Sequence, residues 1–395
     1  MYNTPKSNRL HISIFGKRNS GKSSLINALT NQSLSVVSDI PGTTTDPVSK
    51  SMELLPLGPI VLTDTAGLDD TGSLGELRIG KTKEVLKKTD LAVLVFDACN
   101  RDLTNESKWY HDLKEKNIPV VGVINKIDLS KENCEFIKSN FDISFVEISA
   151  KELINISELT KLLINNAPID FEMPTILGDI IKPKDRVILV APQDIQAPKG
   201  RLILPQVQII RDILDNSGLA LTVKDTELLD ILNCLKDEPS LIITDSQMFK
   251  KVNELIPKNL RLTSFSILMA RYKGDLDLFV RGAKHINLLK PNDKILIAEA
   301  CTHHALKGDI AREKIPRLLE KKVGGKLNIV NITGTDFPEN LSEYKLILHC
   351  GSCMFTRKYL LSRLKQVKDQ NIPITNFGVA LAELNGILDR ACNFL

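Results

Sequence analysis

Short apolar runs, separated by polar segments with helical spacing, recur along the whole chain. The runs Leu10–Phe15, Arg186–Val190, Lys294–Ala298 and Lys345–Leu348 are rich in Ile, Leu and Val and only four to six residues long, which is typical of buried parallel strands. Helical patterns such as Gln208–Asp215 lie between such runs. This alternation predicts α/β domains built on mainly parallel sheets.

At 395 residues the chain is too long for one typical domain. We expect a first α/β domain over residues 1–168, a small α/β domain over 169–263 and a third over 264–395. The proline-containing segment Asn166–Pro183 is interpreted as the first linker. The middle domain has no cluster of ligand-type residues and is therefore a candidate for dimerisation, and its Cys234 is expected to pack in the core.

A phosphate-binding loop follows the first strand. Gly16–Ser23 fits Gly-x-x-x-x-Gly-Lys-Ser and lies between a predicted strand and a helix-like stretch, the context that this motif requires. Backbone N–H groups of such a loop turn toward phosphate oxygens at a helix N-terminus. Lys22 is expected to reach the β and γ phosphates, and the Ser23 hydroxyl to bind Mg²⁺. The residues expected to contact the nucleotide here are Gly16, Asn19, Ser20, Gly21, Lys22, Ser23 and Ser24.

Three later segments indicate that the nucleotide is GTP. A strand ends in Asp-x-x-Gly, where Asp64 is expected to hold Mg²⁺ through water and the Gly67 N–H to meet the γ-phosphate. Another strand ends in Asn-Lys-x-Asp, and the Asp128 carboxylate can accept hydrogen bonds from the N1–H and 2-amino group of guanine, a pair of donors that adenine lacks. The residues expected at the guanine base are Asn125, Lys126, Asp128, Ser149, Ala150 and Lys151.

Taken together, these motifs resemble those of the Ras-like P-loop GTPases over about residues 10–167. Pro41–Asp46 resembles the switch I stretch of the TrmE/Era branch, which implies that Thr45 closes over Mg²⁺ when the γ-phosphate is present. Asn19 matches the residue that helps to hold K⁺ in potassium-activated relatives. Leu68 stands where Ras-type enzymes carry the water-orienting Gln, so the resemblance implies slow hydrolysis. Its implied catalytic residues are Lys22, Thr45, Asp64 and Gly67.

Two of these assignments have alternatives. Thr44 lies one position from Thr45 and would serve if the register differs. Asn19 would otherwise act as a capping side chain of the phosphate loop. Glu76 lies one position away from the switch glutamate of the TrmE branch, so it receives no catalytic role.

Thiols and imidazoles are concentrated in two short segments, 299–304 and 348–354, each directly after a predicted strand. Loops at the carboxyl ends of parallel strands form the ligand crevice of open α/β sheets, so these donors are expected to converge on a metal. The candidate ligands are Cys301, His303, His349, Cys350 and Cys353.

The nature of this second site stays open at this point. Three Cys and one His would suit structural zinc, and three thiolates would equally suit a [4Fe–4S] cluster whose fourth iron takes His or an exogenous ligand. Without a metal, Cys350 and Cys353 would be small core residues or a redox dithiol.

The spacing Cys-x-His, 45 residues, His-Cys-x-x-Cys resembles the cluster signature of the HydF family of [FeFe]-hydrogenase maturation GTPases. The order of the three domains is similar too, so the resemblance covers nearly the whole chain. It implies a [4Fe–4S] cluster on Cys301, Cys350 and Cys353, with His303 or His349 at or near the fourth iron. It also implies a homodimeric scaffold or carrier, which receives a diiron precursor built with two radical-SAM maturases and delivers it to apo-[FeFe]-hydrogenase.

Composition narrows the remaining function classes. A net charge of +4 and 5% aromatic residues do not indicate a nucleic-acid-binding surface. The polar start of the chain predicts no secretory signal, no apolar run is long enough to span a bilayer, and an odd number of clustered cysteines suits a reducing cytoplasm. Two alternatives stay open: an RNA-linked GTPase of the TrmE kind with a structural zinc site, and an iron–sulfur redox-sensing GTPase without cargo.

Overall fold

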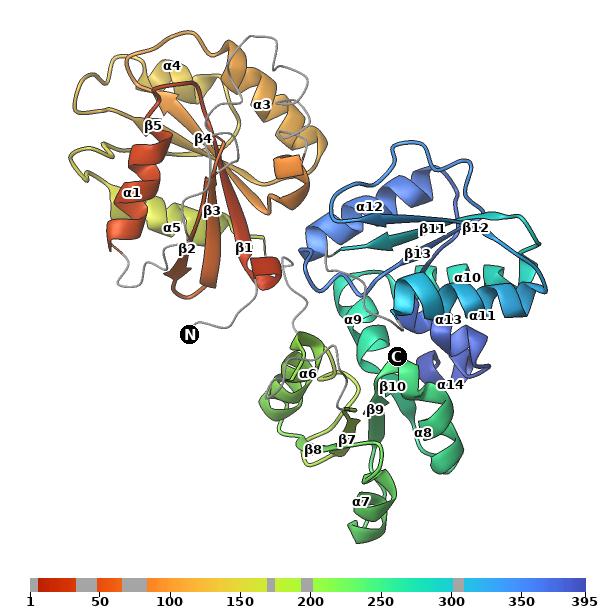
Figure 1. Ribbon diagram of the computed structural model, residues 1–395. Coiled ribbons are helices and arrows are strands. Elements are labelled where there is room, and N and C mark those ends of the chain that lie inside the picture. Colours follow the sequence, from red (N-terminus) through yellow and green to blue (C-terminus); the bar gives the residue numbers. More distant parts are fainter. Residues whose placement is uncertain (1–5, 33–47, 66–83, 169–174, 193–201, 301–308) are drawn as a thin grey trace. The chain divides into compact units, whose positions relative to one another are not determined.

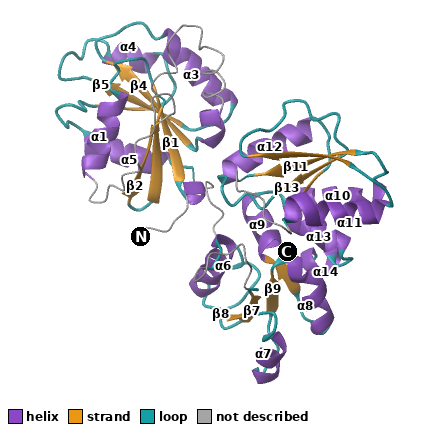
Figure 2. Cartoon of the chain, in the orientation of Figure 1, coloured by secondary structure: helices purple, strands orange, loops and turns teal. Residues whose placement is uncertain are grey.

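The computed structural model describes residues 6–32, 48–65, 84–168, 175–192, 202–300 and 309–395 (Figure 1). The chain divides into two compact units, Met1–Glu172 and Met173–Leu395. Helices and strands alternate in both units, which confirms the predicted α/β class (Figure 2).

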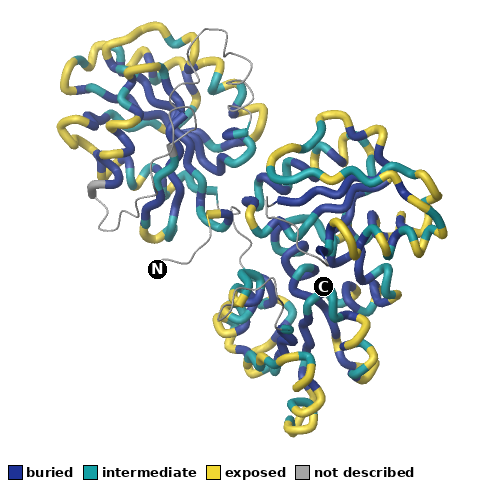
Figure 3. The backbone as a smooth tube through the Cα atoms, viewed as in Figure 1, coloured by how far each residue is buried: buried dark blue, intermediate teal, exposed yellow. Residues whose placement is uncertain are grey.

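The first unit contains one six-stranded sheet with the strand order β2-β3-β1-β4-β5-β6. Its strands are β1 (Leu10–Phe15), β2 (Val48–Leu54), β3 (Gly58–Asp64), β4 (Leu91–Asp97), β5 (Val120–Asn125) and β6 (Ser144–Glu147). β2 pairs antiparallel with β3, whereas the other neighbours pair in parallel. The central strands are buried on both faces, which explains why they read as continuous apolar runs (Figure 3).

Helices cover both faces of this sheet. They are α1 (Lys22–Gln32), α3 (Thr104–Glu115), α4 (Cys134–Ser139) and α5 (Ile156–Asn166), with a 3₁₀ turn η1 (Lys6–Asn8) before β1. Apolar residues of α1 and α5 pack with one face of the central strands, and those of α3, α4 and residues 84–88 pack with the other. The carboxyl ends of the parallel strands therefore remain open at one edge for the loops that follow them.

The second unit contains two four-stranded sheets, both wholly parallel. The first has the order β10-β9-β7-β8, from β7 (Arg186–Val190), β8 (Leu219–Val223), β9 (Leu241–Thr244) and β10 (Leu262–Ser264). The second has the order β12-β11-β13-β14, from β11 (Lys294–Glu299), β12 (Asn328–Thr333), β13 (Leu346–His349) and β14 (Ile374–Asn376).

The helices of the second unit join these two sheets into one structure. They are α6 (Leu204–Asp215), α7 (Leu228–Cys234), α8 (Phe249–Leu255), α9 (Phe265–Lys273), α10 (Leu276–Lys284), α11 (Ile315–Val323), α12 (Arg357–Asp369), α13 (Phe377–Leu384) and α14 (Leu388–Cys392). Short single-turn elements are η2 (Ser246–Met248), η3 (His285–Leu288) and the π-turn η4 (Ile310–Lys314). One continuous apolar core contains residues of both sheets together with α8, α9, α10 and α13.

The packing of α10 on the second sheet is unusually close at one position. A Cβ atom added to Gly282 would lie 1.8 Å from the carbonyl oxygen of Ile374 in β14. Only glycine permits this approach of a helix backbone to a strand backbone.

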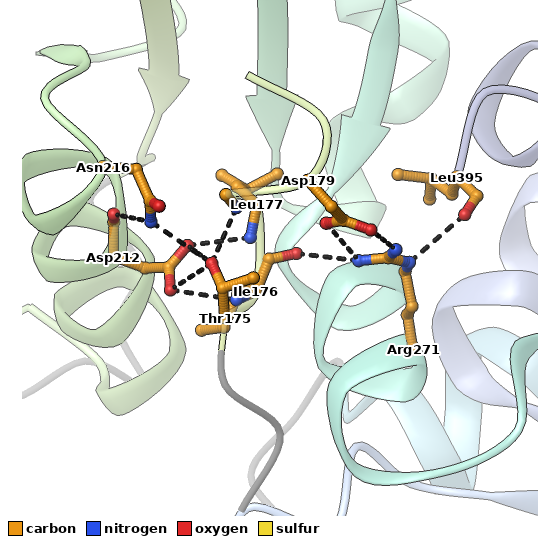
Figure 4. A network of polar contacts seen from close by, with 9 residues as sticks. Thr175, Ile176, Leu177, Asp179, Asp212, Asn216, Arg271 and Leu395 are labelled. Atoms are coloured by element: carbon orange, nitrogen blue, oxygen red, sulfur yellow. Dashed lines mark hydrogen bonds and ion pairs between the residues drawn. The ribbon is translucent and has the colours of Figure 1, made fainter. Parts of the chain in front are cut away.

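The segment predicted as the first linker is packed along its second half. Ile176, Leu177 and Ile181 are buried against α6 and the first sheet of the unit. The Asp212 carboxylate in α6 accepts the backbone N–H groups of Ile176 and Leu177 at 2.9 and 2.7 Å (Figure 4). The prediction that Asn166–Pro183 is one linker was therefore wrong for residues 175–181. Three apolar side chains of this mainly polar segment pack in the core and bury that part of the chain.

Arg271 in α9 holds the same segment from its other side. Its guanidinium donates to the carbonyl oxygen of Ile176 at 3.1 Å and to that of Leu395 at 3.2 Å, and it forms an ion pair with Asp179 (Figure 4). This contact holds the pKa of the Asp179 carboxyl below its usual range. The segment that follows the first unit is thus fixed to helix α9.

Three cysteines differ in burial in a way that sequence periodicity could not show. Cys134 and Cys392 are buried, and burial raises the pKa of the Cys392 thiol to about 12. Cys234 is exposed, so the expectation that it packs in the core was wrong. In its short helix α7 only Leu228 is buried. Within the described ranges no helix is long and apolar enough to cross a membrane.

Candidate functional sites

The phosphate-binding loop Gly16–Ser23 joins β1 to α1 at the carboxyl edge of the first sheet. Gly21 has a φ of +91°, and a Cβ atom there would lie 2.2 Å from Nδ2 of Asn125, so both its backbone conformation and its surroundings require glycine. Lys22 begins α1, is buried, and donates to the carbonyl oxygens of Gly16 and Lys17. Its ammonium group therefore lies inside the loop, where the motif predicts the phosphates.

Ser23 and Asp64, the two predicted Mg²⁺ ligands that lie within the described residues, are adjacent to each other. The Ser23 hydroxyl donates to Oδ2 of Asp64 at 2.7 Å, which joins the start of α1 to the end of β3. A hydroxyl and a carboxylate are hard oxygen donors of the kind that Mg²⁺ prefers, so this pair fits the ion. Thr45 and Gly67, the other two residues predicted for this chemistry, lie outside the described residues.

The side chain of Asn125 connects three loops at the predicted base-binding edge. The Asn125 amide donates to the carbonyl oxygen of Ser20 at 2.9 Å and accepts the N–H of Ala150 at 3.0 Å. Asn125 is 3% exposed, and Ser149 is fully buried. The structure therefore brings together the phosphate loop, the Asn-Lys-x-Asp loop and the Ser-Ala-Lys loop.

The other predicted base contacts lie on the surface of these loops. Lys126 adopts a φ of +68° and forms an ion pair of 2.6 Å with Asp97 at the end of β4. Asp128 and Lys151 are exposed, as is Ser24, which leaves their side chains accessible to a ligand. Asn19, the predicted potassium ligand, is also exposed and has a φ of +64°.

Lys17 of the phosphate loop contacts two acids that sequence reasoning did not single out. Its ammonium lies 2.7 Å from Asp102 and 3.6 Å from Glu106. The hydrogen bond from Lys17 lowers the pKa of Asp102, whereas burial raises the pKa of Glu106. These contacts join the phosphate loop to the start of α3.

The Cys-x-x-Cys loop lies at the carboxyl edge of the last sheet, between β13 and α12. β13 pairs with β11 so that His349 lies opposite Ala298, and the Cys350 N–H donates to the Ala298 carbonyl at 2.9 Å. The Cys350 sulfur accepts the backbone N–H of Ala300 at 3.0 Å. Ala300 directly precedes Cys301 in the chain, so the ends of the two ligand segments lie together.

The cysteines of this loop are chemically suited to a soft metal centre. The thiols of Cys350 and Cys353 are partly exposed, and the N–H of Ser352 also points to the Cys350 sulfur, at 3.5 Å. Sulfur that accepts backbone N–H groups is stabilised as a thiolate. Cys301 and His303 lie outside the described residues, and the residues that are described contain no group of three or more metal-type donors.

His349 is held by hydrogen bonds at both ring nitrogens. It is fully buried, and Arg363 donates to its Nε2 at 3.0 Å. Because guanidinium can only donate, Nε2 accepts, and Nδ1 carries the hydrogen that points to the Cys350 carbonyl at 3.0 Å. Burial, followed by the charge of Arg363, lowers the pKa of His349 to about 3. In this arrangement His349 braces the loop as a neutral imidazole and presents no unbonded nitrogen.

Two buried cations support the loop, and no sequence motif marks them. Lys273 at the end of α9 donates to carbonyl oxygens of the loop, and Arg363 in α12 bonds His349. Both side chains are 2% exposed. A Lys or Arg within an otherwise ordinary helical pattern is usually solvated, so only tertiary structure reveals such positions.

Three protein families match successive parts of the chain. Residues 11–126 match the family described as 50S ribosome-binding GTPase. Residues 176–274 match the Hydrogen maturase F dimerization domain, and residues 277–394 match the Hydrogen maturase F tetramerization domain. The chain therefore carries a P-loop GTPase domain followed by two domains for self-association.

Part of the chain is similar in sequence to known GTPases. The tRNA modification GTPase MnmE of Thermoanaerobacter sp. (strain X514) is 42% identical over 160 residues, which are 40% of this chain and 34% of that protein. MnmE of Aquifex aeolicus (strain VF5) is 34% identical over 164 residues, 41% of this chain and 35% of that protein. The chain thus spans about a third of the length of these relatives. A crystal structure of Aquifex aeolicus Era bound to GDP and AlF4⁻ is also similar. The match covers 54% of this chain and 94% of the Era chain, with a TM-score of 0.34 and 22% identity.

Proposed function

Since the chain belongs to the HydF family, whose two domains match more than half of it, we propose that it is a GTP-hydrolysing iron–sulfur scaffold for [FeFe]-hydrogenase maturation. It holds a [4Fe–4S] cluster and delivers the diiron precursor of the H-cluster to apo-hydrogenase. The observation that carries this proposal is the Cys350 sulfur, which accepts the N–H of the residue before Cys301 at the edge of the last sheet.

The donor set fits the cluster. Cys301, Cys350 and Cys353 would supply three thiolates, the ligands that hold iron–sulfur clusters. A cluster held by three thiolates supplies one exchangeable coordination position, which suits a carrier that must release its cargo. Since both nitrogens of His349 are hydrogen-bonded within the protein, His349 orients the loop, and His303 is the protein ligand that we propose near the fourth iron.

In the first unit the described residues would bind GTP as follows. The Lys22 ammonium would reach the β and γ phosphates, and Ser23 and Asp64, whose side chains are hydrogen-bonded to each other, would hold Mg²⁺. Asp128 recognises the guanine edge. Thr45 and the Gly67 N–H, which lie outside the described residues, would complete the γ-phosphate site.

Hydrolysis should be slow and stimulated by potassium. Leu68 cannot orient a water molecule as a glutamine does, so positive charge beside the phosphates must stabilise the transition state. Asn19 would hold a K⁺ ion that supplies this charge. Replacing K⁺ by Na⁺ at constant ionic strength is expected to slow GTP hydrolysis in the wild type but to have little effect in Asn19→Ala.

Anaerobic reconstitution with iron and sulfide tests the cluster proposal. Dithionite reduction is expected to give an S = 1/2 EPR signal that is lost when Cys301, Cys350 and Cys353 are replaced together by Ala. The Cys134→Ala variant, which removes a buried cysteine of the first unit, is the control and should keep the signal. Stoichiometric zinc without an EPR-active cluster would overturn the proposal and favour an RNA-linked GTPase with a structural zinc site, as the similarity to MnmE would then suggest.

The carrier role is tested separately from the cluster. We propose that the diiron precursor comes from two radical-SAM maturases, and that the protein acts as a homodimer in the cytoplasm. After co-expression with such maturases, Fe–CO and Fe–CN infrared bands should co-purify with the protein. A bound cluster without these bands under matched expression would contradict the carrier and favour a redox-sensing GTPase.

A further inference from the structure

We propose that Lys273 and Arg363 are positioning residues of the cluster loop, which hold its backbone and make the bound cluster easier to reduce. The electrostatic half of this inference rests on the proposed function, because it concerns a cluster on Cys350 and Cys353. The positioning half concerns the protein alone. Neither residue belongs to the predicted ligand set.

Lys273 anchors the loop through its backbone. The ammonium group donates to the carbonyl oxygens of Ser352 and Cys353, both at 3.4 Å, and of Phe355 at 3.1 Å. An ammonium group has three N–H donors, so it can bond all three carbonyls at once. The Phe355 N–H also donates to the Ser352 carbonyl at 3.0 Å, which closes a turn around the buried cation.

The direction of these carbonyls decides where the loop N–H groups point. In a planar trans peptide the C=O and the following N–H point to opposite sides. Since the carbonyls of Ser352 and Cys353 point to Lys273, the N–H groups of Cys353 and Met354 point away from it. They point to the side of the loop opposite Lys273, and hydrogen bonds from such N–H groups to sulfur help to set the potential of an iron–sulfur cluster.

Arg363 in α12, the helix that follows the loop, fixes the start of the loop. Its guanidinium donates to Nε2 of His349 at 3.0 Å and to the Gly334 carbonyl at 2.7 Å. It lies over the rings of Phe355 and Tyr359, at 4.6 and 5.2 Å from their centroids. Arginine stacks on aromatic rings and makes directed hydrogen bonds at once, so this position is specific for guanidinium.

Two buried positive charges beside the loop have an electrostatic consequence. One-electron reduction adds a negative charge to a cluster, and nearby positive charge of low solvent exposure stabilises that state. Removing one cation should lower the equilibrium constant for reduction by about tenfold or more, and tenfold corresponds to 59 mV for a one-electron couple.

The main test is Lys273→Gln, because the amide still donates hydrogen bonds to carbonyls but carries no charge. Its midpoint potential, from an EPR-monitored redox titration of the reconstituted protein, should fall by at least about 59 mV. Lys284→Gln removes the same charge from an exposed site at the end of α10 and should leave the potential unchanged. A potential of Lys273→Gln equal to that of the control would overturn the electrostatic half.

Arg363→Gln is the second variant, with the exposed Arg317→Gln on α11 as its control. It should shift the potential in the same direction, and it keeps the inference testable if Lys273→Gln does not fold. If Lys273→Gln does not fold, a shift below threefold in the equilibrium constant of Arg363→Gln would refute the electrostatic role.

The positioning half is measured without a cluster. Hydrogen exchange of the peptide spanning 350–356 should be about tenfold faster in Lys273→Met than in Lys284→Met, because Met cannot bond the three carbonyls. Equal exchange in a folded Lys273→Met protein would overturn it. If the wild type takes up no cluster, the proposed function fails while this measurement still decides the positioning role.

Discussion

Replacing Asn125 by Ala or Asp is expected to weaken guanine nucleotide binding by at least tenfold. The Asn125 side chain is nearly fully buried and connects two loops, through the Ser20 carbonyl at 2.9 Å and the Ala150 N–H at 3.0 Å. Both loops belong to the predicted nucleotide site. A change at this side chain therefore acts on phosphate and base contacts together.

The magnitude follows from what each substitution leaves behind. Asn125→Ala leaves a buried carbonyl and a buried N–H without their partner, at about 1–3 kcal/mol each. Asn125→Asp keeps an acceptor for the Ala150 N–H but turns a second acceptor toward the Ser20 carbonyl, where the amide donated. The two unpaired groups together cost about 2–6 kcal/mol, which exceeds the 1.4 kcal/mol that corresponds to tenfold in affinity.

Titration with a fluorescent GDP analogue measures this affinity directly. Asn133→Ala is the matched control, because its side chain also donates to a backbone carbonyl, that of Ala98 at 2.8 Å, but outside the predicted nucleotide contacts. It should bind within threefold of the wild type. If folded Asn125→Ala and Asn125→Asp proteins also bind within threefold, the bridging role deduced from the structure is refuted.

Three further outcomes are expected. Cys350→Ser should abolish cluster loading, measured as iron per chain, and leave GTP hydrolysis nearly intact, since the two sites lie in separate units. A comparable loss of cluster loading and of GTP hydrolysis in a folded protein would contradict the independence of the two sites. Gly282→Ala should destabilise the second unit by about 1–3 kcal/mol in urea unfolding, because its Cβ would meet the β14 backbone, whereas Gly351→Ala, which meets no atom within 4 Å, should have little effect. The pKa of His349 is lowered to about 3 from 6.5, so as the pH falls below 6.5 the unfolded chain takes up a proton that the folded chain excludes. The free energy of unfolding should therefore fall by about 2 kcal/mol more between pH 7.5 and 5 in the wild type than in His349→Gln, and equal pH dependence of the two would show that this histidine does not titrate as deduced.

Much of the first unit was predictable because its signals are local. β1 was predicted at its observed bounds, and β5 ends at Asn125 as its motif requires, because buried parallel strands are short apolar runs followed by loops of fixed chemistry. The same reasoning placed Cys350 directly after β13. Each of these predictions depends on residues that lie close together in the sequence.

The supports of the candidate sites depend on contacts between distant residues and were missed. Lys273 lies 80 residues before Cys353, and its helical pattern does not distinguish a buried lysine from a solvated one. The hydrogen bond between Arg363 and His349 likewise could not be predicted from a motif in which histidine is a potential ligand. Whether these side chains bind the loop or are solvated depends on their burial. Their burial depends on how the helices pack, which the sequence pattern does not show.

Helix α9 makes two of the contacts described above, one from each of two opposite faces. Arg271 binds the segment that follows the first unit, and Lys273 binds the cysteine loop. Side chains two positions apart leave a helix axis about 200° apart, so the two face away from each other. Because the nine residues of α9 form one hydrogen-bonded helix, a rotation of this helix that follows residues 175–179 would also displace the ammonium group bonded to the cysteine loop.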